Sequence, residues 1–297
     1  MKILVTGSGG LIGQPLTIAL RGQGHDVLEF DLKRSSQQDI RNRDAVRAAL
    51  NGASGVIHLA AISRVGFAEN SPELCKSVNE LAFQQLLDIC ASSSRPPWLI
   101  FSSSREVYGR QERLPVSETA PLNPINVYGC SKYYGENIVF QVREKLLAAN
   151  VVRFSNVYGT TNDHADRVIP AFARTSVLGG SLFVEDGERC FDFVHVDDVV
   201  RGLLVLVELT ASGNNFEPMH LASRVSTKLI DLAHLAIAHA RKPVTLIHRV
   251  SRGQGYSFVG DTSRAHQLLG WQNQTAIEQG FARLVDDYEN SVTADLN

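Results

Sequence analysis

The sequence predicts an α/β fold in which a doubly wound parallel sheet is followed by a second, smaller α/β lobe. Two observations lead to this fold class. Short apolar runs alternate with longer segments in which apolar residues recur at helical spacing, as is typical of repeated strand–helix units and a parallel sheet. The strand segments are also nearly continuous in apolar residues, as expected when helices cover both faces of a sheet.

The expected elements follow one another along the first half of the chain. Strands are expected at about 2–7, 25–31, 55–61, 98–104 and 150–159, and helices up to about 22 and at about 44–50, 72–91 and 128–148. The pattern loosens beyond Gly159, and residues 190–212 look like a return to the main sheet. We therefore expect a first domain over residues 1–158 with a return segment at about 190–212. A smaller substrate-binding lobe would comprise residues 159–189 and 213–297.

The composition bounds what the protein can bind. The chain has 297 residues, of which 44% are hydrophobic and 20% charged; its formal net charge is −2 and it has no basic run, which argues against nucleic acid as a partner. No apolar run reaches the roughly 18 residues that a membrane span needs, and the chain starts directly with a strand-like segment. We therefore expect a cytoplasmic protein with no membrane partner.

The four cysteines, Cys75, Cys90, Cys130 and Cys190, lie far apart in the sequence and form no CxxC pair. This spacing predicts neither a disulfide framework nor a zinc site. We expect packing thiols and no bound metal.

Three glycines follow the first predicted strand, in the segment VTGSGGLIG. Gly7, Gly10 and Gly13 stand three residues apart, where the strand ends and the first helix begins. The first permits a tight turn, the second lets the backbone approach a pyrophosphate, and the third lets helix and strand pack closely. Asp31 closes the second strand, at the position from which an acid bonds a ribose 2′-hydroxyl. The pattern predicts a dinucleotide-binding site.

The charges around Asp31 indicate which dinucleotide binds. A carboxylate repels a 2′-phosphate, so we expect NAD as the cofactor. Lys33 and Arg34 follow closely and leave NADP open, because either side chain can turn toward such a phosphate.

Pro15 conflicts with a helix that starts directly after the glycine turn. If the helix began near Leu11, Pro15 would stand just past the first turn, where proline removes one backbone hydrogen bond and crowds the preceding turn. We therefore expect a bent or late-starting helix.

Tyr128 and Lys132 lie four residues apart in the segment YGCSK, at the start of a predicted helix, and so share one helix face. A tyrosine with an ordinary pKa near 10 is a poor base at neutral pH. A neighbouring ammonium favours the phenolate and is expected to lower the pKa of Tyr128, so that it can take a proton from an alcohol. Together with the glycine turn and a serine cluster at a strand end, the pair predicts a catalytic site.

These segments together resemble the extended short-chain dehydrogenase/reductase superfamily, and within it the NAD-dependent nucleotide-sugar epimerase/dehydratase family. The segments occur in family order over nearly the whole chain: TGSGGLIG, VIHLAA, SSSREVYG, YGCSK, VVRFSNVYG, DFVHVDDV and LLGW. The resemblance implies that residues 1–158 form an NAD-binding Rossmann domain. It also implies three catalytic residues: Tyr128 as the base, Lys132 as its partner and as a ribose ligand, and Ser104 as the hydroxyl beside the reacting oxygen.

The resemblance also assigns binding residues, position by position. For NAD these are Gly7, Gly10, Leu11, Ile12, Gly13, Asp31, Asp39, Ile40, Ala60, Ala61, Asn79, Ser102, Tyr128 and Lys132. For the substrate they are Ser104, Arg105, Glu106, Asn156, Arg189 and Arg252. His58 and His195 stand on apolar strands and are expected to be core residues rather than acid–base groups.

Arg105 and Glu106 depart from the family pattern, because family dehydratases carry an Asp-Glu pair there and use the aspartic acid to protonate a leaving hydroxyl. Arginine is charged at any ordinary pH and cannot act as that acid, which argues against dehydration. Arg105 is expected either to contact an acidic substituent of the sugar, such as a uronate carboxylate, or simply to pair with Glu106 or face solvent.

A second departure concerns the nucleotide diphosphate. Phe191 stands where the family usually has an arginine for this group, and Arg189, two residues earlier, is the candidate replacement. Arg252 matches the other family arginine, although its flanking proline and aspartate are missing.

The function expected from these residues is a nucleotide-sugar 4-epimerase that acts on a UDP-hexose or UDP-hexuronate through a 4-keto intermediate. Two alternatives stay open: a nucleotide-linked 4-ketosugar reductase that uses the same Tyr128 and Lys132, and a non-catalytic module that senses a dinucleotide. The resemblance further implies a homodimer in which the helices at 72–91 and 128–148 form a four-helix interface.

Overall fold

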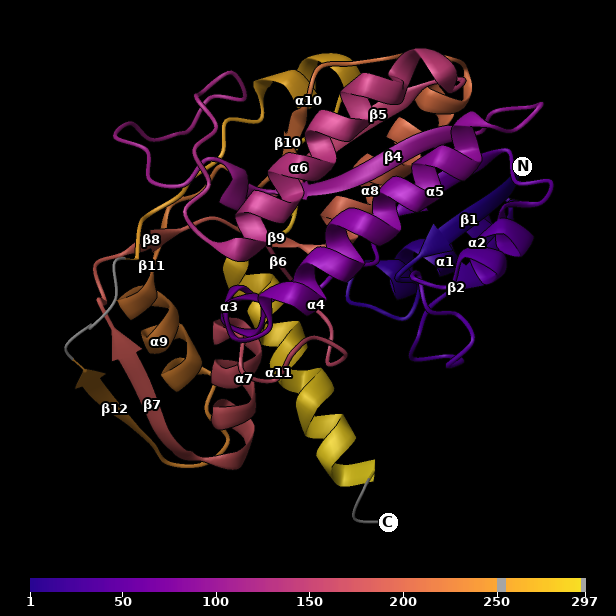
Figure 1. The fold of residues 1–297 in the computed structure, drawn as a ribbon. Coiled ribbons are helices and arrows are strands. Elements are labelled where there is room, and N and C mark those ends of the chain that lie inside the picture. The colour runs from indigo at the N-terminus through magenta and orange to yellow at the C-terminus, as the bar shows by residue number, and fades with distance from the viewer. Residues whose placement is uncertain (250–254, 295–297) are drawn as a thin grey trace.

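A six-stranded parallel sheet lies at the centre of the larger lobe. The computed structural model describes residues 1–249 and 255–294 (Figure 1). The sheet has the strand order β10-β5-β4-β3-β1-β2, with β1 at Lys2–Thr6, β2 at Asp26–Phe30, β3 at Gly55–His58, β4 at Trp98–Ser104, β5 at Ala149–Phe154 and β10 at Met219–Leu221. All five strand pairings are parallel, which confirms the predicted α/β class.

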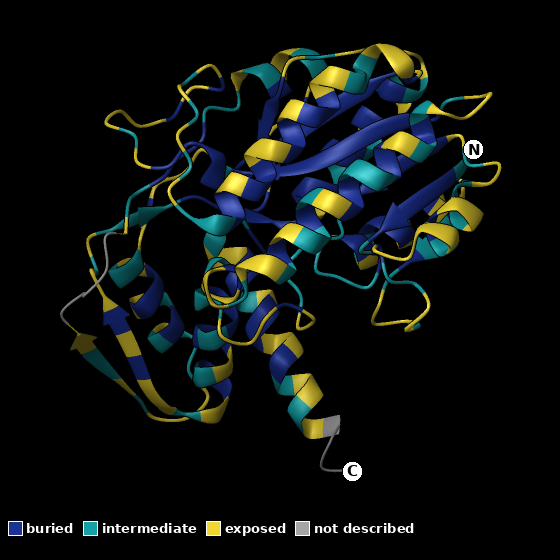
Figure 2. Ribbon diagram, in the orientation of Figure 1, coloured by how far each residue is buried: buried dark blue, intermediate teal, exposed yellow. Residues whose placement is uncertain are grey.

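Helices cover both faces of this sheet. One layer contains α1 (Gly13–Gly22), α8 (Val196–Ala211) and α10 (Ser263–Leu269). The other contains α2 (Arg43–Leu50), α5 (Ala82–Ala91) and α6 (Val127–Val142). Figure 2 shows the consequence: the central strand β4 is dark blue along its whole length, whereas α5 and α6 alternate between buried and exposed residues. This is why the strands have continuous apolar sequences and the helices periodic ones.

The smaller lobe has its own apolar core between helices and a two-stranded sheet. Strand β7 (Gly180–Glu185) pairs in parallel with β12 (Val244–Arg249), and α7 (Val168–Leu178), α9 (Leu229–Ala238) and α11 (Ile277–Ala294) pack against them (Figure 1). Two short ladders lie between this core and the main sheet. They pair β6 (Asn156–Tyr158) with β9 (Phe193–His195), and β8 (Cys190–Phe191) with β11 (Thr227–Lys228).

The helix expected at 72–91 is divided into three pieces. After the short helix α3 (Val65–Asn70), α4 covers Pro72–Lys76, a π-helical turn covers Ser77–Leu81, and α5 follows. A π-helical turn inserts one extra residue into the helix and re-aims its side chains. Here it contains Asn79, whose buried side chain holds the segment after β3.

Two other expected elements end earlier than the sequence indicates. Helix α6 ends at Val142 and gives way to a 3₁₀ turn at Arg143–Lys145, although the sequence pattern continues to Ala148. The strand expected at 150–159 breaks at Ser155, where the chain leaves the main sheet to form β6. Buried residues recur beyond both ends, at Leu146 and Ala148 and at Val157 and Tyr158, so apolar sequence alone does not mark where the element ends.

The boundary drawn between the lobes needs one correction. The sequence placed residues 213–297 in the smaller lobe, but β10 pairs with β5 at the edge of the main sheet, and α10 packs against the same core. A three-residue strand carries too little pattern to be recognised from sequence. The division of the rest into two functional domains stays a prediction.

Helix α1 begins at Gly13, two residues later than Leu11, as Pro15 led us to expect. Pro15 therefore lies within the first turn of the helix. The backbone N–H groups of Gln14 and Leu16 donate to the carbonyl oxygens of Gly10 and Ile12, each at 3.1 Å, so Pro15 interrupts the ladder by one hydrogen bond.

No helix in the described part of the chain is both long enough and apolar enough to cross a membrane. All four cysteines are free, Cys75 and Cys90 in the core, Cys190 partly covered and Cys130 at the surface. The packing role expected of the cysteines therefore holds for the first two but not for Cys130.

A buried ion pair joins α6 to β5. Arg153 binds both carboxylate oxygens of Glu136, at 2.9 Å from Nε and 2.6 Å from Nη2, and the two side chains are 4% and 1% exposed. Ser103 on β4 donates to the same carboxylate at 2.5 Å, and Arg153 also donates to the Tyr108 hydroxyl at 2.7 Å. Every charge in this pair is therefore matched by hydrogen bonds, which a buried pair requires.

The network continues from Tyr108 to the last strand of the sheet. The Tyr108 hydroxyl lies 2.7 Å from Nε2 of His220 on β10, and Nδ1 of His220 lies 2.7 Å from the carbonyl oxygen of Asp261. Burial lowers the pKa of His220 to about 4, so this ring is neutral and can accept at one nitrogen and donate at the other. The network thus connects β4, α6, β5 and β10.

Arg153→Met is expected to destabilise the protein by about 3–5 kcal/mol, because it leaves the Glu136 carboxylate buried without its counter-charge. The double variant Glu136→Gln, Arg153→Met should lose less, because no charge is then left unpaired. Urea unfolding of the three proteins measures this. Lys228→Met, which breaks the exposed pair with Glu188, is the control and should change stability little. A loss for Arg153→Met no larger than the control would contradict the role of the network.

Candidate active site

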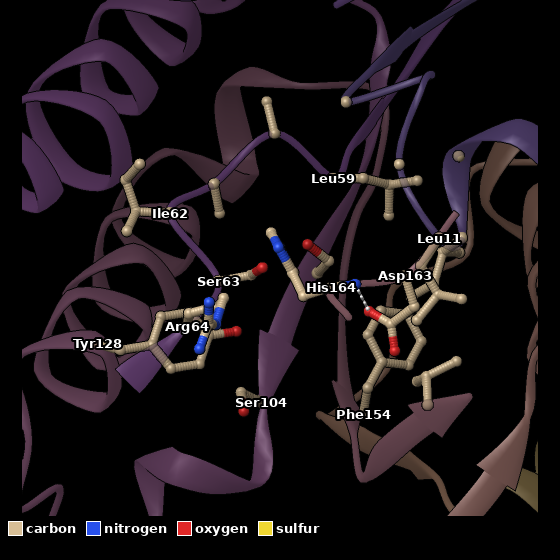
Figure 3. Close-up of a pocket in the computed structure, with 18 of the residues that line it drawn as sticks. Leu11, Leu59, Ile62, Ser63, Arg64, Ser104, Tyr128, Phe154, Asp163 and His164 are labelled. Carbon is tan, nitrogen blue, oxygen red and sulfur yellow. Dashed lines mark hydrogen bonds between the residues drawn. The ribbon is translucent and has the colours of Figure 1, made fainter. Parts of the chain in front are cut away.

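A pocket of about 680 Å³ opens at the carboxyl ends of the strands of the main sheet (Figure 3). Residues following β1, β2, β3, β4 and β5 line it, and the segment before α7 closes it from the smaller lobe. This is the place where open parallel sheets bind ligands, because the loops after neighbouring strands meet there.

The glycine turn forms one wall of this pocket, and its geometry requires glycine. Gly7 has a φ of 71°, and a Cβ there would lie 2.7 Å from the backbone nitrogen of Ala60. A Cβ on Gly13 would lie 2.1 Å from the carbonyl oxygen of Gly7. The bare backbone that results, at the N-terminus of α1, fits the pyrophosphate of a dinucleotide.

Asp31 lies beside this turn and is fixed by backbone donors. Its carboxylate accepts hydrogen bonds from the backbone N–H of Gly9 at 2.8 Å and of Lys33 at 2.7 Å. Arg34, which could have met a 2′-phosphate, pairs instead with Glu29 on β2. Of the two cations, only Lys33 lines the pocket. The Asp31 carboxylate therefore faces less positive charge than the sequence allowed, and this favours a free ribose hydroxyl and hence NAD.

Asp39 and Ile40 line the far end of the same pocket. The Asp39 carboxylate is held by the Arg41 guanidinium, with Nε at 3.0 Å, and this bond holds the pKa of Asp39 below its ordinary value. Ala60 and Ala61, which follow β3, complete this wall of the pocket.

Asn79, in contrast, lies behind the pocket wall and does not line it. Its Oδ1 accepts from the backbone N–H of Ile62 at 2.8 Å, and its Nδ2 donates to the Ile62 carbonyl oxygen at 3.0 Å and to the Ser131 hydroxyl at 2.9 Å. It therefore anchors the segment after β3 to α6. This geometry argues against a direct contact between Asn79 and NAD.

Ser104, Tyr128 and Lys132 line one side of the pocket, with Ser102 beside them. Ser104 ends β4 and Tyr128 lies across the pocket from it (Figure 3). Tyr128 and Lys132 both belong to the first turns of α6. Lys132 Nζ donates to the carbonyl oxygen of Ser102 at 2.8 Å. The structure thus brings together the three residues that sequence analysis selected for catalysis.

The protonation of this group differs from the sequence expectation in one respect. Burial raises the pKa of Tyr128 to about 12, and the interaction with the Ser104 side chain offsets only part of this rise. Lys132 was expected to lower the pKa of Tyr128, but its Nζ lies 5.9 Å from the centroid of the tyrosine ring and is itself desolvated. Desolvation has the largest effect on the Tyr128 pKa, and the nearby cation that lowers this pKa is Arg167 rather than Lys132.

Arg105 and Glu106 form an ion pair at the pocket wall rather than at the surface. Arg105 Nη2 lies 2.9 Å from Glu106 Oε1, and the two side chains are 13% and 10% exposed. A solvated Arg105 is thereby excluded, and pairing with Glu106 is observed. Glu106 is also bonded by the Asn126 amide at 2.7 Å and the Tyr256 hydroxyl at 2.6 Å.

The remaining predicted substrate residues divide into three cases. Asn156 lines the pocket, with its amide donating to the carbonyl oxygen of Asp192 at 3.0 Å. Arg189 does not line the pocket and pairs with Asp186. Arg252 lies outside the described residues.

Sequence analysis missed several polar residues of the pocket, among them Ser63, Arg64, Asp163, His164 and Arg167. Arg167 Nη1 lies 3.3 Å from Asp163, and Arg64 pairs with Asp166, so both arginines are held by ion pairs. Figure 3 shows Asp163 and His164 reaching the cavity from the segment before α7. These residues lie on irregular loops without periodicity or a motif, so no sequence pattern points to them.

Both histidines that were assigned to the core are buried. His58 stacks on Phe83 with ring centroids 4.4 Å apart, and burial lowers its pKa to about 3. His195 accepts a hydrogen bond from the backbone N–H of Asp197 at 3.2 Å and so caps α8. Neither histidine lines the pocket, so a structural role is confirmed.

Known proteins with the same arrangement can now be compared. The model of the NAD dependent epimerase/dehydratase family matches residues 3–222. A UDP-glucose 4-epimerase of Mycolicibacterium smegmatis is 28% identical over 314 residues, which cover 98% of this chain and 99% of the relative. UDP-glucuronate 4-epimerase 5 of Arabidopsis thaliana is 29% identical over 330 residues, covering 97% of this chain and 75% of the relative.

A solved structure shows the same fold. The UDP-glucuronic acid 4-epimerase of Bacillus cereus, in complex with UDP-glucuronic acid and NAD, superimposes with a TM-score of 0.86 at 25% identity and covers 98% of this chain and 100% of the other. The chain belongs to the NAD dependent epimerase/dehydratase family. Membership confirms NAD as the cofactor and agrees with the glycine turn and Asp31 that fit it.

The burial of Lys132 has a consequence for stability. Its pKa is lowered to about 8 from an ordinary value of 10.5, so between these values the unfolded chain binds more protons than the folded one. Wild type is therefore expected to gain stability relative to Lys132→Met as the pH rises through this window.

Urea unfolding of the cofactor-free proteins at about pH 7.5, 8.5 and 9.5 measures this gain, which approaches at most about 1.4 kcal/mol per pH unit. Subtracting the Lys132→Met values removes the contribution of other groups that titrate in the same range. A constant difference between the two proteins across this range would show that Lys132 is not desolvated.

Proposed function

We propose that the protein is an NAD-dependent nucleotide-sugar 4-epimerase that acts on a UDP-hexose or UDP-hexuronate. The observation that carries the proposal is the position of Ser104, Tyr128 and Lys132 on the wall of the same pocket that the glycine turn and Asp31 line. The relatives named as UDP-glucose and UDP-glucuronate 4-epimerases support this choice of substrates.

The mechanism follows from the groups at the end of β4 and on α6. The Tyr128 hydroxyl, as phenolate, takes the proton of the sugar 4-hydroxyl, and Ser104 hydrogen-bonds the same oxygen. NAD, when bound, supplies the acceptor for the C4 hydride and, with it, a positive charge. The 4-keto sugar turns over in the pocket, regains hydride on its other face, and takes the proton back from Tyr128. No net oxidation results.

Lys132 and the desolvated pocket determine when Tyr128 can act as a base. A phenolate at Tyr128 is unfavourable in the pocket as it stands, because burial has raised the pKa to about 12. Positive charge near Tyr128 lowers its pKa. Tyr128 would therefore become an effective base when the positive charge of bound NAD is added to that of the buried Lys132 ammonium. Arg105 argues against dehydration, because a guanidinium with a pKa above about 12 is too weak an acid to protonate a leaving hydroxyl.

Tyr128→Phe is expected to lower turnover by about 10²- to 10⁴-fold while NAD stays bound, because the variant loses only the hydroxyl that moves the proton. Interconversion of UDP-glucose with UDP-galactose, and of UDP-glucuronate with UDP-galacturonate, is followed by chromatography of the sugars. Tyr134→Phe, an exposed tyrosine on the same helix, is the matched control and should keep wild-type turnover.

The two alternatives give different outcomes in the same experiment. A purified protein that lacks NAD and shows only net reduction with added NADPH would be a 4-ketosugar reductase. A protein that retains NAD but whose binding properties do not depend on Tyr128, with no turnover of any nucleotide-sugar, would be a sensing module. Either result would contradict the epimerase proposal.

We also propose that the protein is a cytoplasmic homodimer joined through α5, α6 and the turn before α5. These helices lie side by side on one face of the sheet (Figure 1). Leu86 and Ile138 point into the core, whereas Leu81 and Phe140 are 58% and 38% exposed. A second copy of the same surface would bury these apolar side chains in a two-fold interface.

Light scattering at micromolar concentration is expected to give the mass of two chains. Phe140→Asp should shift it toward one chain, because the charge would be buried in the interface. Ile18→Asp, which charges an exposed apolar residue on α1 instead, should leave the dimer intact. A wild-type protein that scatters as a monomer would refute the proposed interface.

A further inference from the structure

Arg105 occupies an unusual environment for a charged side chain. It extends from the turn directly after Ser104 and lies against three aromatic rings, with its guanidinium carbon 6.0 Å from the centroid of Phe191, 5.5 Å from that of Tyr256 and 5.7 Å from that of Phe258. Ring faces at this distance attract a cation and exclude water from it. The guanidinium is thus held in a fixed position at the pocket wall.

Glu106, the ion-pair partner of Arg105, has other hydrogen-bond donors besides Arg105. Glu106 Oε1 is bonded by Arg105, while Oε2 is bonded by the Asn126 amide and the Tyr256 hydroxyl. A carboxylate held by three donors needs only part of the guanidinium. The rest of the guanidinium is left for another acceptor.

One nitrogen of Arg105 has no partner among the residues that the structure describes. Nη1 is buried without a hydrogen bond to any residue that the structure describes. The two other pocket arginines nearby differ in this respect, because Arg64 pairs with Asp166 and Arg167 pairs with Asp163. A buried donor without an acceptor is costly, and proteins seldom keep one unless a ligand satisfies it.

We propose that Arg105 binds a carboxylate on the sugar, so that the preferred substrate is a nucleotide-linked hexuronate rather than a hexose. This inference rests on the proposed 4-epimerase function. The ligand class follows from charge: a fixed guanidinium with a free nitrogen, shielded by aromatic rings, is matched by an anionic oxygen.

The position of Arg105 in the chain favours a carboxylate over the nucleotide phosphates. Ser104 and Tyr128 act on the oxygen at C4 of the sugar, and Arg105 is the residue next to Ser104. On a hexuronate the carboxylate is attached to C5, the carbon next to C4, whereas the diphosphate is attached to C1 across the ring. A neighbour of the catalytic serine therefore reaches the C5 substituent first.

The test compares UDP-glucuronate with UDP-glucose on NAD-loaded enzyme, with dissociation constants from calorimetry and turnover from chromatography. Wild type is expected to prefer UDP-glucuronate. Arg105→Met should weaken UDP-glucuronate binding by about 10- to 100-fold and UDP-glucose binding by less than about threefold. Arg241→Met, at an exposed site on the smaller lobe, is the matched control and should leave the preference unchanged.

Arg105→Met leaves Glu106 with two of its three donors, so the double variant Arg105→Met, Glu106→Gln guards against loss of folding. It removes both charges together and should show the same lost preference for UDP-glucuronate. Unfolding measurements on both variants confirm that they are folded under the assay conditions.

Three outcomes would overturn the inference. An equal loss for both sugars in Arg105→Met would assign the guanidinium to the diphosphate, and an unchanged preference would show that Arg105 only pairs with Glu106. In both cases wild type still interconverts UDP-sugars, so the 4-epimerase function stands. If wild type neither binds nor converts either sugar, the proposed function fails and the inference fails with it.

Discussion

The buried ion pair between Glu136 and Arg153 is the contact on which the active site depends. It fixes α6 against β5, and through Ser103 it fixes α6 against β4 as well. Tyr128 and Lys132 lie on that helix, and Ser104 ends that strand, so the ion pair helps to set the separation between these three pocket residues. A charged pair in a core contributes little net stability, but its hydrogen bonds allow one register only.

The two ends of the pocket carry different chemical groups. At one end, glycines and Asp31 present bare backbone and a ribose acceptor, and this end is built for a dinucleotide. At the other end, the buried hydroxyl groups of Ser104 and Tyr128 and the ammonium group of Lys132 line the pocket. The desolvation that raises the pKa of Tyr128 is the same property that strengthens every electrostatic contact made inside the closed pocket.

Arg105 and Glu106 show how one substitution changes the chemistry available to a family fold. Where family dehydratases have an acid, this chain has a cation whose charge is held by Glu106 and by the rings of Phe191, Tyr256 and Phe258. Phe191 is itself a departure, in the place of a family arginine. The two departures meet in space, so the aromatic ring at 191 and the guanidinium at 105 are parts of one arrangement.

The sequence by itself determined the α/β class, the dinucleotide turn, the acid at Asp31, and the placement of Tyr128 and Lys132 on one face of a helix. These depend on local spacing, since residues four apart share a helix face and glycines three apart shape one turn. Only the tertiary structure decided that Asn79 lies behind the pocket and that β10 joins the main sheet. It also decided that burial raises the pKa of Tyr128, and that Arg105 lies among aromatic rings of residues about 90 to 150 positions away in the sequence. Burial and long-range contact set these properties, and neither is encoded in the spacing of neighbouring residues.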